Sequence, residues 1–277
     1  WVRALQRIGV TRVSLGVQSF STQGLVTLGR AHRGQKAREA VETIHEAGLD
    51  GSVDLIVGWP GQTFAALDAD IDTLVASGVA HVSVYALTIE PGTPWVGLVD
   101  RGVRDPVDED AQGELLERTE RLLVNAGFVH YEVASYAKPG KQAAHNRKYW
   151  RWRDFLGFGP SAASAVRTAD GGTERRHNVR GFAPWTQIPG GGPVDTERLE
   201  GEAAAREGLW LGLRLLEPLD TASLEDRFQR PSGWVVDRLQ RQFALGNVQQ
   251  CAPGRVVVAP GRWLWHDVIA KDLLGPP

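Results

Sequence analysis

Residues 52–63, Ser-Val-Asp-Leu-Ile-Val-Gly-Trp-Pro-Gly-Gln-Thr, decide the fold. Ser52 to Val57 form a short, nearly continuous apolar run, which is typical of a strand that is buried on both faces of a sheet. Gly58 to Thr63 are turn residues, and the pattern that follows predicts a helix over 64–77 that ends at Gly78. A buried strand that leads into such a helix is the building unit of a parallel sheet.

The same unit recurs on both sides of this stretch. The pattern predicts strands at 13–17, 81–87 and 129–133 and helices at 35–47 and 108–126, with glycine stops at Gly48 and Gly127. Four such strands linked by helices predict an α/β protein with an open or incomplete parallel sheet and right-handed crossovers. Polar residues at the carboxyl ends of the strands are then the first candidates for chemistry.

The second half of the chain has a different pattern. Residues 167–200 are rich in glycine and proline, which indicates a linker or an ordered loop laid over the first domain. Beyond them we predict helices at 202–216, 223–228, 234–244 and 263–274 and a strand at 255–259, which suggest a small winged-helix-like domain. The expected division is therefore 1–166, 167–200 and 201–277. The last part has no excess of basic residues, so we expect no nucleic-acid partner.

Composition excludes several classes of protein. The 277 residues carry a net charge of −2, and their only cysteine, Cys251, rules out an internal disulfide and any all-cysteine metal site within this chain. We find no signal peptide and no apolar run long enough to cross a bilayer, so we expect a cytoplasmic protein without stable membrane insertion. Because the chain has no methionine, we expect an N-terminal piece to be missing and one edge of the sheet to be bare.

Four segments carry a resemblance to a known family. They are 16–20 with 28–32, 54–63, 87–94, and 145–150 leading into 156–161. In this order and spacing the chain resembles the HemW-type haem chaperones, a branch of the coproporphyrinogen dehydrogenase-like radical S-adenosylmethionine (SAM) proteins. The resemblance implies a partial (β/α) radical SAM barrel with its N-terminal strands missing.

The chain also departs from that family. The family carries a Cys-x-x-x-Cys-x-x-Cys motif for a [4Fe–4S] cluster, and that segment would precede Trp1. Cys251 cannot replace three thiolates, so the cluster is a cofactor of the full-length family that this chain does not ligate by itself. The family usually has histidine where Ala163 stands, which weakens a porphyrin role for that loop.

Three residues are candidates for binding SAM. Asp54 lies inside an apolar strand, where a carboxylate must be hydrogen-bonded or paired, and Gln18 closes the first predicted strand. Arg30 offers a planar fork suited to a carboxylate. From the residues alone, the favoured explanation of the pattern is Asp54 as a helix cap, Arg30 as a surface charge and Gln18 as a loop amide. The family resemblance assigns all three to the cofactor.

His145 opens the segment His-Asn-Arg-Lys-Tyr-Trp and is the candidate for binding haem. Its imidazole could ligate the iron axially, Tyr149, Trp150 and Trp152 could stack on the macrocycle, and nearby basic residues could meet the propionates. The alternative is a structural histidine in an aromatic surface loop. No catalytic residue and no metal ligand is assigned.

Three functions remain open. The first is a haem chaperone that binds SAM and haem and delivers haem to apo-proteins. The second is an oxygen-independent coproporphyrinogen III oxidase of porphyrin biosynthesis. The third is a cluster-less, non-catalytic remnant, so the sequence leaves open whether the chain is an enzyme.

Overall fold

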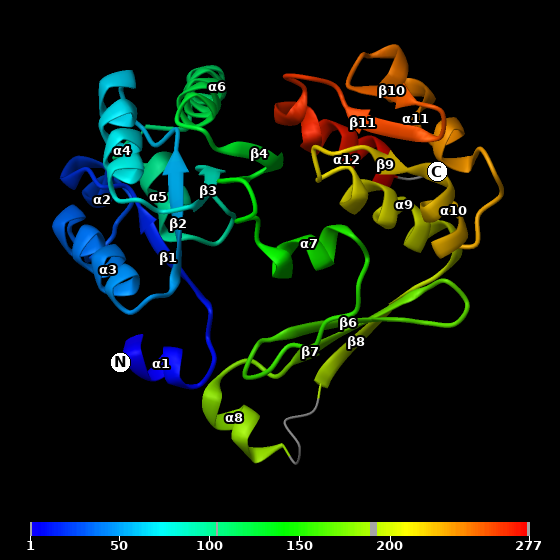
Figure 1. The fold of residues 1–277 in the computed structure, drawn as a ribbon, viewed down its shortest axis with the longest axis horizontal. Coiled ribbons are helices and arrows are strands. Elements are labelled where there is room, and N and C mark those ends of the chain that lie inside the picture. The colour runs from blue at the N-terminus through cyan, green and yellow to red at the C-terminus, as the bar shows by residue number, and fades with distance from the viewer. Residues whose placement is uncertain (1, 104, 189–192, 276–277) are drawn as a thin grey trace. The chain divides into compact units, whose positions relative to one another are not determined.

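The computed structural model describes residues 2–103, 105–188 and 193–275. They form two compact units, Trp1–Gln142 and Ala143–Pro277, which are described in turn (Figure 1). No helix in these described ranges combines the length and the apolar character that crossing a bilayer requires.

The first unit is built on a five-stranded sheet. Its strands are β1 (Arg12–Gln18), β2 (Asp50–Val57), β3 (His81–Ala86), β4 (Val129–Glu132) and β5 (Ser135–Ala137). Their order in the sheet is β1-β2-β3-β5-β4, so the sheet is open, with β1 and β4 at its edges. β1, β2 and β3 are parallel, as the apolar runs predicted.

The expectation of a fourth parallel strand is wrong. β4 pairs antiparallel with β5, which in turn pairs antiparallel with β3. Only residues 133 and 134 separate β4 from β5, and so short a link permits a hairpin but no parallel crossover. The strand itself was predicted correctly, but its direction depends on Ser135–Ala137, a segment too short to show a pattern.

Helices accompany the parallel strands. They are α1 (Val2–Arg7), α2 (Thr22–Thr27), α3 (Gly34–Glu46), α4 (Phe64–Ala76), α5 (Pro94–Asp100) and α6 (Glu109–Asn125). Thr63 caps α4 and Asp108 caps α6, since each side-chain oxygen accepts a backbone N–H of the first turn. Gly48, Gly78 and Gly127 have positive φ where α3, α4 and α6 end, as their role as C-terminal stops requires.

The two faces of the sheet differ in polarity. Val53, Leu55 and Val57 of β2 are buried, and Figure 1 shows α3 and α4 along one side of β1 and β2. Residues that alternate with them point to the opposite face. Asp54 and two serines, its register partner Ser83 on β3 and Ser14 on β1, therefore share the polar face of the sheet.

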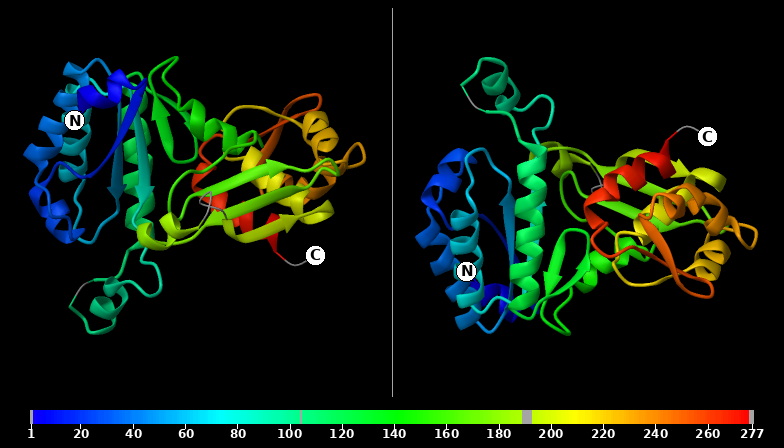
Figure 2. Two further views of the ribbon diagram at one scale, coloured as in Figure 1. Left: turned by 90° about the horizontal axis from the view of Figure 1, so that it is seen from below. Right: turned by 90° about the horizontal axis from the view of Figure 1, so that it is seen from above.

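The second unit contains a three-stranded antiparallel sheet. It is formed by β6 (Ala163–Arg167), β7 (Thr173–Asn178) and β8 (Pro193–Leu199), with α7 (Ala144–Trp150) before it and α8 (Phe182–Gln187) between β7 and β8. The green and yellow-green strands run side by side in Figure 2. Much of the glycine- and proline-rich segment 167–200 thus forms strands, where a linker or an ordered loop was expected. The sequence pattern did not predict β7 and β8, because both strands are rich in charged residues and neither has an apolar face.

The rest of the second unit is mainly helical. Its elements are α9 (Gly201–Gly212), β9 (Leu219–Asp220), α10 (Thr221–Arg227), α11 (Trp234–Ala244), β10 (Val248–Ala252), β11 (Arg255–Val258), the 3₁₀ turn η2 (Trp263–Trp265) and α12 (His266–Leu274). Leu209, Leu224 and Leu239 are fully buried in its core. From α9 to β11 the elements follow the order of a winged-helix-like domain, which is a helix, a strand, two helices and a hairpin. The compact units divide after Gln142, so a separate domain at 201–277 stays a prediction.

Candidate functional site

Gln18 lies at the carboxyl end of β1 in an unusual backbone conformation. Its φ is 70°, a left-handed value that costs a side-chain-bearing residue about 1 kcal/mol or more. It pairs with Leu55 of β2, and the register between the strands is irregular between Leu15 and Gln18. A Cβ on Gly16 would lie 2.9 Å from the Gln18 amide nitrogen, so glycine leaves room for the amide beside the strand. Strain of this kind is concentrated at functional sites.

The turn that follows Gln18 is held by a buried carboxylate. Asp70 on α4 accepts the Ser19 hydroxyl at 2.6 Å and the Phe20 backbone N–H at 2.9 Å. Burial raises the pKa of Asp70, and these hydrogen bonds oppose the rise. The sequence analysis missed this residue. An acidic residue next to Ile71, on the apolar face of a predicted helix, was the signal that could have identified it.

Asp54 lies in the middle of β2 between two serines. The Ser14 hydroxyl of β1 is 3.3 Å from each carboxylate oxygen, and Ser83 of β3 is a second hydrogen-bond partner. Burial raises the pKa of Asp54, and the serine hydrogen bonds oppose the rise. Its partners are on neighbouring strands, which does not match the helix-cap alternative. A half-buried carboxylate of this kind can accept further hydrogen bonds from hydroxyl groups.

Arg30 is placed differently. It follows α2, its backbone N–H donates to Leu25, and its side chain is exposed. In the part of the chain that the structure describes, no hydrogen bond or ion pair of its guanidinium is recorded. The structure therefore places Gln18 and Asp54 on adjacent strands, with Gln18 paired to Leu55, and among the described residues it gives Arg30 no contact with either.

His145 lies on α7 in the second unit, with an exposed side chain. Its Nε2 is 2.5 Å from the Tyr149 hydroxyl one turn later, and the two rings meet edge to face. Tyr149 also packs edge-on against Phe155 at 4.4 Å between ring centres. Because that hydroxyl can either donate or accept, the contact is compatible with either tautomer of His145.

The basic and aromatic neighbours of His145 are largely engaged. Arg147 donates to Glu217 at 2.9 Å, and Arg151 also pairs with Glu217. The guanidinium of Arg214 lies over the Trp150 ring at 4.4 Å. The Trp152 indole donates to the Gly208 carbonyl at 2.7 Å. Two arginines and two tryptophans expected around a haem thus already have partners, which leaves Tyr149 as the ring in contact with His145.

The residues present do not fit an iron–sulfur cluster. Cys251 is exposed on β10, and its thiol faces the Arg255 carbonyl at 3.6 Å. Across the described ranges, no group of three or more His, Cys, Asp or Glu side chains is placed to hold a metal ion. A [4Fe–4S] cluster needs several thiolates, so no step through such a cluster is derived for this chain.

Comparison with known proteins gives three findings. The sequence profile of the Radical SAM superfamily matches residues 1–74. "Heme chaperone HemW" of Escherichia coli (strain K12) is 40% identical over 183 residues, covering 64% of this chain and 47% of that protein. The protein of the same name from Mycobacterium tuberculosis (strain CDC 1551 / Oshkosh) is 33% identical over 275 residues, covering 98% of this chain and 67% of its own length.

A solved structure has the same fold. The coproporphyrinogen III oxidase HemN of Escherichia coli, described as a radical SAM enzyme, superposes with a TM-score of 0.76 at 18% identity. The match covers 99% of this chain and 66% of HemN. The α/β architecture with a parallel core is therefore that of a radical SAM protein. The chain spans about half to two thirds of the length of the proteins it matches.

Proposed function

The chain belongs to the HemW family of haem chaperones in the radical SAM superfamily, and we propose that it binds SAM and haem and delivers haem to apo-proteins. SAM is assigned to the first unit and haem to the second. Since the matched proteins are longer than this chain, each of these activities is a proposal for this chain.

The SAM site is assigned to Gln18, Asp54 and Arg30. Support comes from the Asp54 carboxylate, which lies among hydroxyl groups on the polar face of the sheet, and from the strained Gln18 on the adjacent strand. The amide and the carboxylate would accept hydrogen bonds from the ribose hydroxyls, and the exposed guanidinium of Arg30 would bind the methionyl carboxylate. Asp70 acts as a positioning residue, because it holds the turn after Gln18.

The observation that carries the haem proposal is the state of His145. It is an exposed imidazole with a hydroxyl partner, on a helix whose remaining rings and arginines are already engaged. An exposed neutral imidazole is an axial ligand that haem iron accepts. The haem would dock against Tyr149 and the exposed side of α7, and the apo-protein recipient would take it from there.

The two other functions have less support. The sequence of the matched coproporphyrinogen III oxidase is 18% identical to this chain, and similarity at that level supports the fold alone. Radical chemistry would need a cluster that one cysteine cannot ligate, so we propose no catalytic step. A remnant that keeps only an interaction surface would bind haem no more tightly than a protein with an unrelated exposed histidine. The titration described next tests this.

We expect haem binding by the full chain to depend on His145. Haemin titrated against the wild type and His145→Ala, followed by the Soret band, should show an affinity loss of about tenfold or more in the variant, because the axial nitrogen is gone. Cys251→Ser should bind like the wild type, since its thiol lies on β10 far along the chain.

The matched control is His177→Ala, which removes an exposed histidine from β7 in the same unit. It should leave both the affinity and the spectrum unchanged. If His145→Ala keeps the wild-type affinity and an unshifted Soret band, the chaperone proposal loses its residue-level support and the motif is structural.

A further inference from the structure

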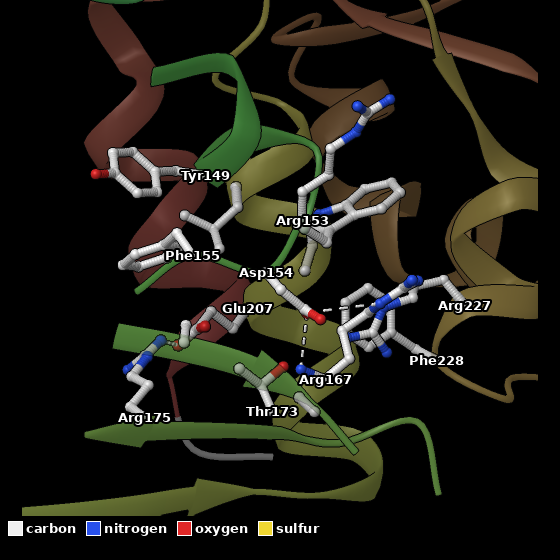
Figure 3. Close-up of a pocket in the computed structure, with 15 residues that line it drawn as sticks. Tyr149, Arg153, Asp154, Phe155, Arg167, Thr173, Arg175, Glu207, Arg227 and Phe228 are labelled. Carbon is white, nitrogen blue, oxygen red and sulfur yellow. Dashed lines mark hydrogen bonds and ion pairs between the residues drawn. The ribbon is translucent and has the colours of Figure 1, made fainter. Parts of the chain in front are cut away.

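The second unit contains a cavity that shares Tyr149 with the proposed haem site but does not include His145. It has a volume of about 180 Å³ and lies between α9, the strands β6 and β7, and the end of α10 (Figure 3). Ala204 and Gly208 of α9 form part of its wall, and the rings of Trp152 and Phe228 meet edge to face at 5.7 Å beside it. The lining is thus mainly aromatic and small apolar groups, with charged side chains on two sides.

The two charged sides differ. On one side Arg175 pairs with both Glu207 and Glu197, so its charge is compensated. On the other side a single carboxylate, Asp154, faces two arginines, Arg167 and Arg227 (Figure 3). Arg167 is its direct partner, with the backbone N–H at 2.9 Å and the guanidinium Nε at 3.7 Å. One positive charge is left over at this end.

Arg227 carries that excess charge. Its guanidinium donates to the carbonyls of Gly171 and Gly172, which compensate no charge. Its Nε is buried, and no acceptor for it occurs among residues 2–103, 105–188 and 193–275. Burial lowers the pKa of Arg227, and the charge of Arg167 lowers it further. A cation held in this way is stabilised by any anion that reaches it.

We propose that this cavity binds a carboxylate carried on a flat, ring-sized apolar group, with the carboxylate between Arg227 and Arg167 and the ring against Trp152 and Phe228. Arginine offers a planar fork to a carboxylate, and aromatic walls favour a flat apolar body. A cavity of about 150 Å³ holds one benzene ring, whereas drug-sized ligands occupy about 300 Å³ or more. The site therefore takes one ring with its acid, and it is too small for a whole tetrapyrrole.

Two sources share this chemistry: a small free aromatic acid, and one propionate-bearing arm of a larger molecule. Neither depends on His145 or on the SAM residues. The cavity shares Tyr149 with the proposed haem site but not His145, so loss of haem binding in His145→Ala and loss of acid binding in Arg227→Gln are separate outcomes.

The test is a titration of the full chain with 3-phenylpropionate, followed by ligand-observed NMR or calorimetry. We expect saturable binding that weakens as salt is added, because the attraction is electrostatic. The neutral 3-phenylpropanamide should bind about tenfold more weakly or not at all. Equal binding of acid and amide would overturn the proposal, as would no saturable binding of the acid.

Two variants with opposite expected effects make the test specific. Arg227→Gln removes the excess charge and should weaken binding of the acid about tenfold. Asp154→Asn removes the competing carboxylate, keeps a carbonyl acceptor for the Arg167 backbone N–H, and should tighten binding several-fold. Arg241→Gln, on an arginine paired with Asp272 outside the cavity, is the matched control and should bind like the wild type. If both cavity variants also bind like the wild type, the assignment is wrong.

Thermal unfolding of each variant keeps the outcome interpretable. Should Arg227→Gln unfold early because the Gly171 and Gly172 carbonyls lose their donor, Asp154→Asn still decides the question. Competition separates the two sources: displacement by haemin but not by its dimethyl ester indicates a propionate arm. Failure of haemin to compete indicates a free acid.

Discussion

At the scale of single residues, the candidate SAM site combines a strained backbone with carboxylates that are held by hydrogen bonds. Gln18 adopts a left-handed backbone that glycine would adopt more easily, and the buried Asp70 holds the turn after it. Asp54 keeps its carboxylate among serine hydroxyls. Natural proteins retain such backbone strain where the side chain has a role that glycine, which has no side chain, cannot fill.

This strain gives a prediction for Gln18. Gln18→Gly should raise the free energy of unfolding by up to about 1 kcal/mol, because it relieves the left-handed strain. Gln18→Ala should bring no such gain, since alanine keeps the strain. Urea unfolding followed by tryptophan fluorescence measures both.

The same two variants test the role of the Gln18 amide. Each should bind SAM about fivefold more weakly, the equivalent of one lost hydrogen bond. A glycine variant that is more stable and binds SAM as well as the wild type would remove Gln18 from the site. A glycine variant less stable than Ala would show that no strain is stored there.

At the scale of elements, the second unit depends on close packing around α9. A Cβ on Gly208 would lie 2.2 Å from two ring atoms of Phe228, which itself is almost fully buried. The Gly208 carbonyl also accepts the Trp152 indole, and Trp152 has a left-handed φ of 54° at the end of α7. One glycine therefore allows α10 and the segment after α7 to meet α9.

We expect Gly208→Ala to lower the free energy of unfolding by about 1–3 kcal/mol, because the new methyl group overlaps the Phe228 ring and the neighbouring rings must shift. Gly113→Ala is the matched control. It lies in the middle of α6 with nothing within 4 Å of an added Cβ. It should stabilise by about 0.5–1 kcal/mol through helix propensity. Chemical denaturation of both decides; a neutral Gly208→Ala would mean that the contact relaxes freely.

At the scale of the whole molecule, a deeply buried histidine lies in each unit. His81 bonds to Ser52 at 2.7 Å and to the Tyr131 hydroxyl at 2.9 Å on the polar face of the first sheet. Burial lowers the pKa of His81 to about 4, with a smaller contribution from Arg12. Burial likewise lowers the pKa of His266 in the second unit to about 4, helped by Arg214.

The stability of both units should therefore fall on acidification. Between the unfolded pKa of about 6.5 and the folded pKa of about 4, the unfolded chain binds a proton that the folded chain does not. Each histidine then contributes stability that is complete above pH 6.5 and is lost towards pH 4, at most about 3 kcal/mol. The raised pKa values of Asp54 and Asp70 have the opposite sign and offset part of this loss.

Urea midpoints measured from pH 7.5 to 4.5 check this expectation. In His81→Gln the acid-dependent loss of the first unit should be smaller, because glutamine keeps a hydrogen-bonding group and does not titrate. The second unit of that variant should keep its pH dependence through His266. A variant with the full pH dependence of the wild type would show that His81 is already protonated in the folded chain.

The sequence by itself determined the parallel part of the fold and the family. Strand β2 and the helix after it follow from local rules, since an apolar run of six residues and a glycine stop act over a few neighbours. Gln18, Asp54 and His145 could be singled out for the same reason. Their chemistry and motif positions are visible one residue at a time.

Only the tertiary structure decided the remaining features, because they depend on contacts between distant segments. The reversal of β4 rests on pairing with a three-residue strand, and β7 and β8 carry charges on both faces. Asp70 accepts a hydrogen bond from the backbone N–H of Phe20, which lies fifty residues earlier in the chain. The charge of Arg227 is in excess because Asp154 is already paired with Arg167. Such features arise when the fold brings charges and backbone groups from distant segments together, and no local pattern records which groups will meet.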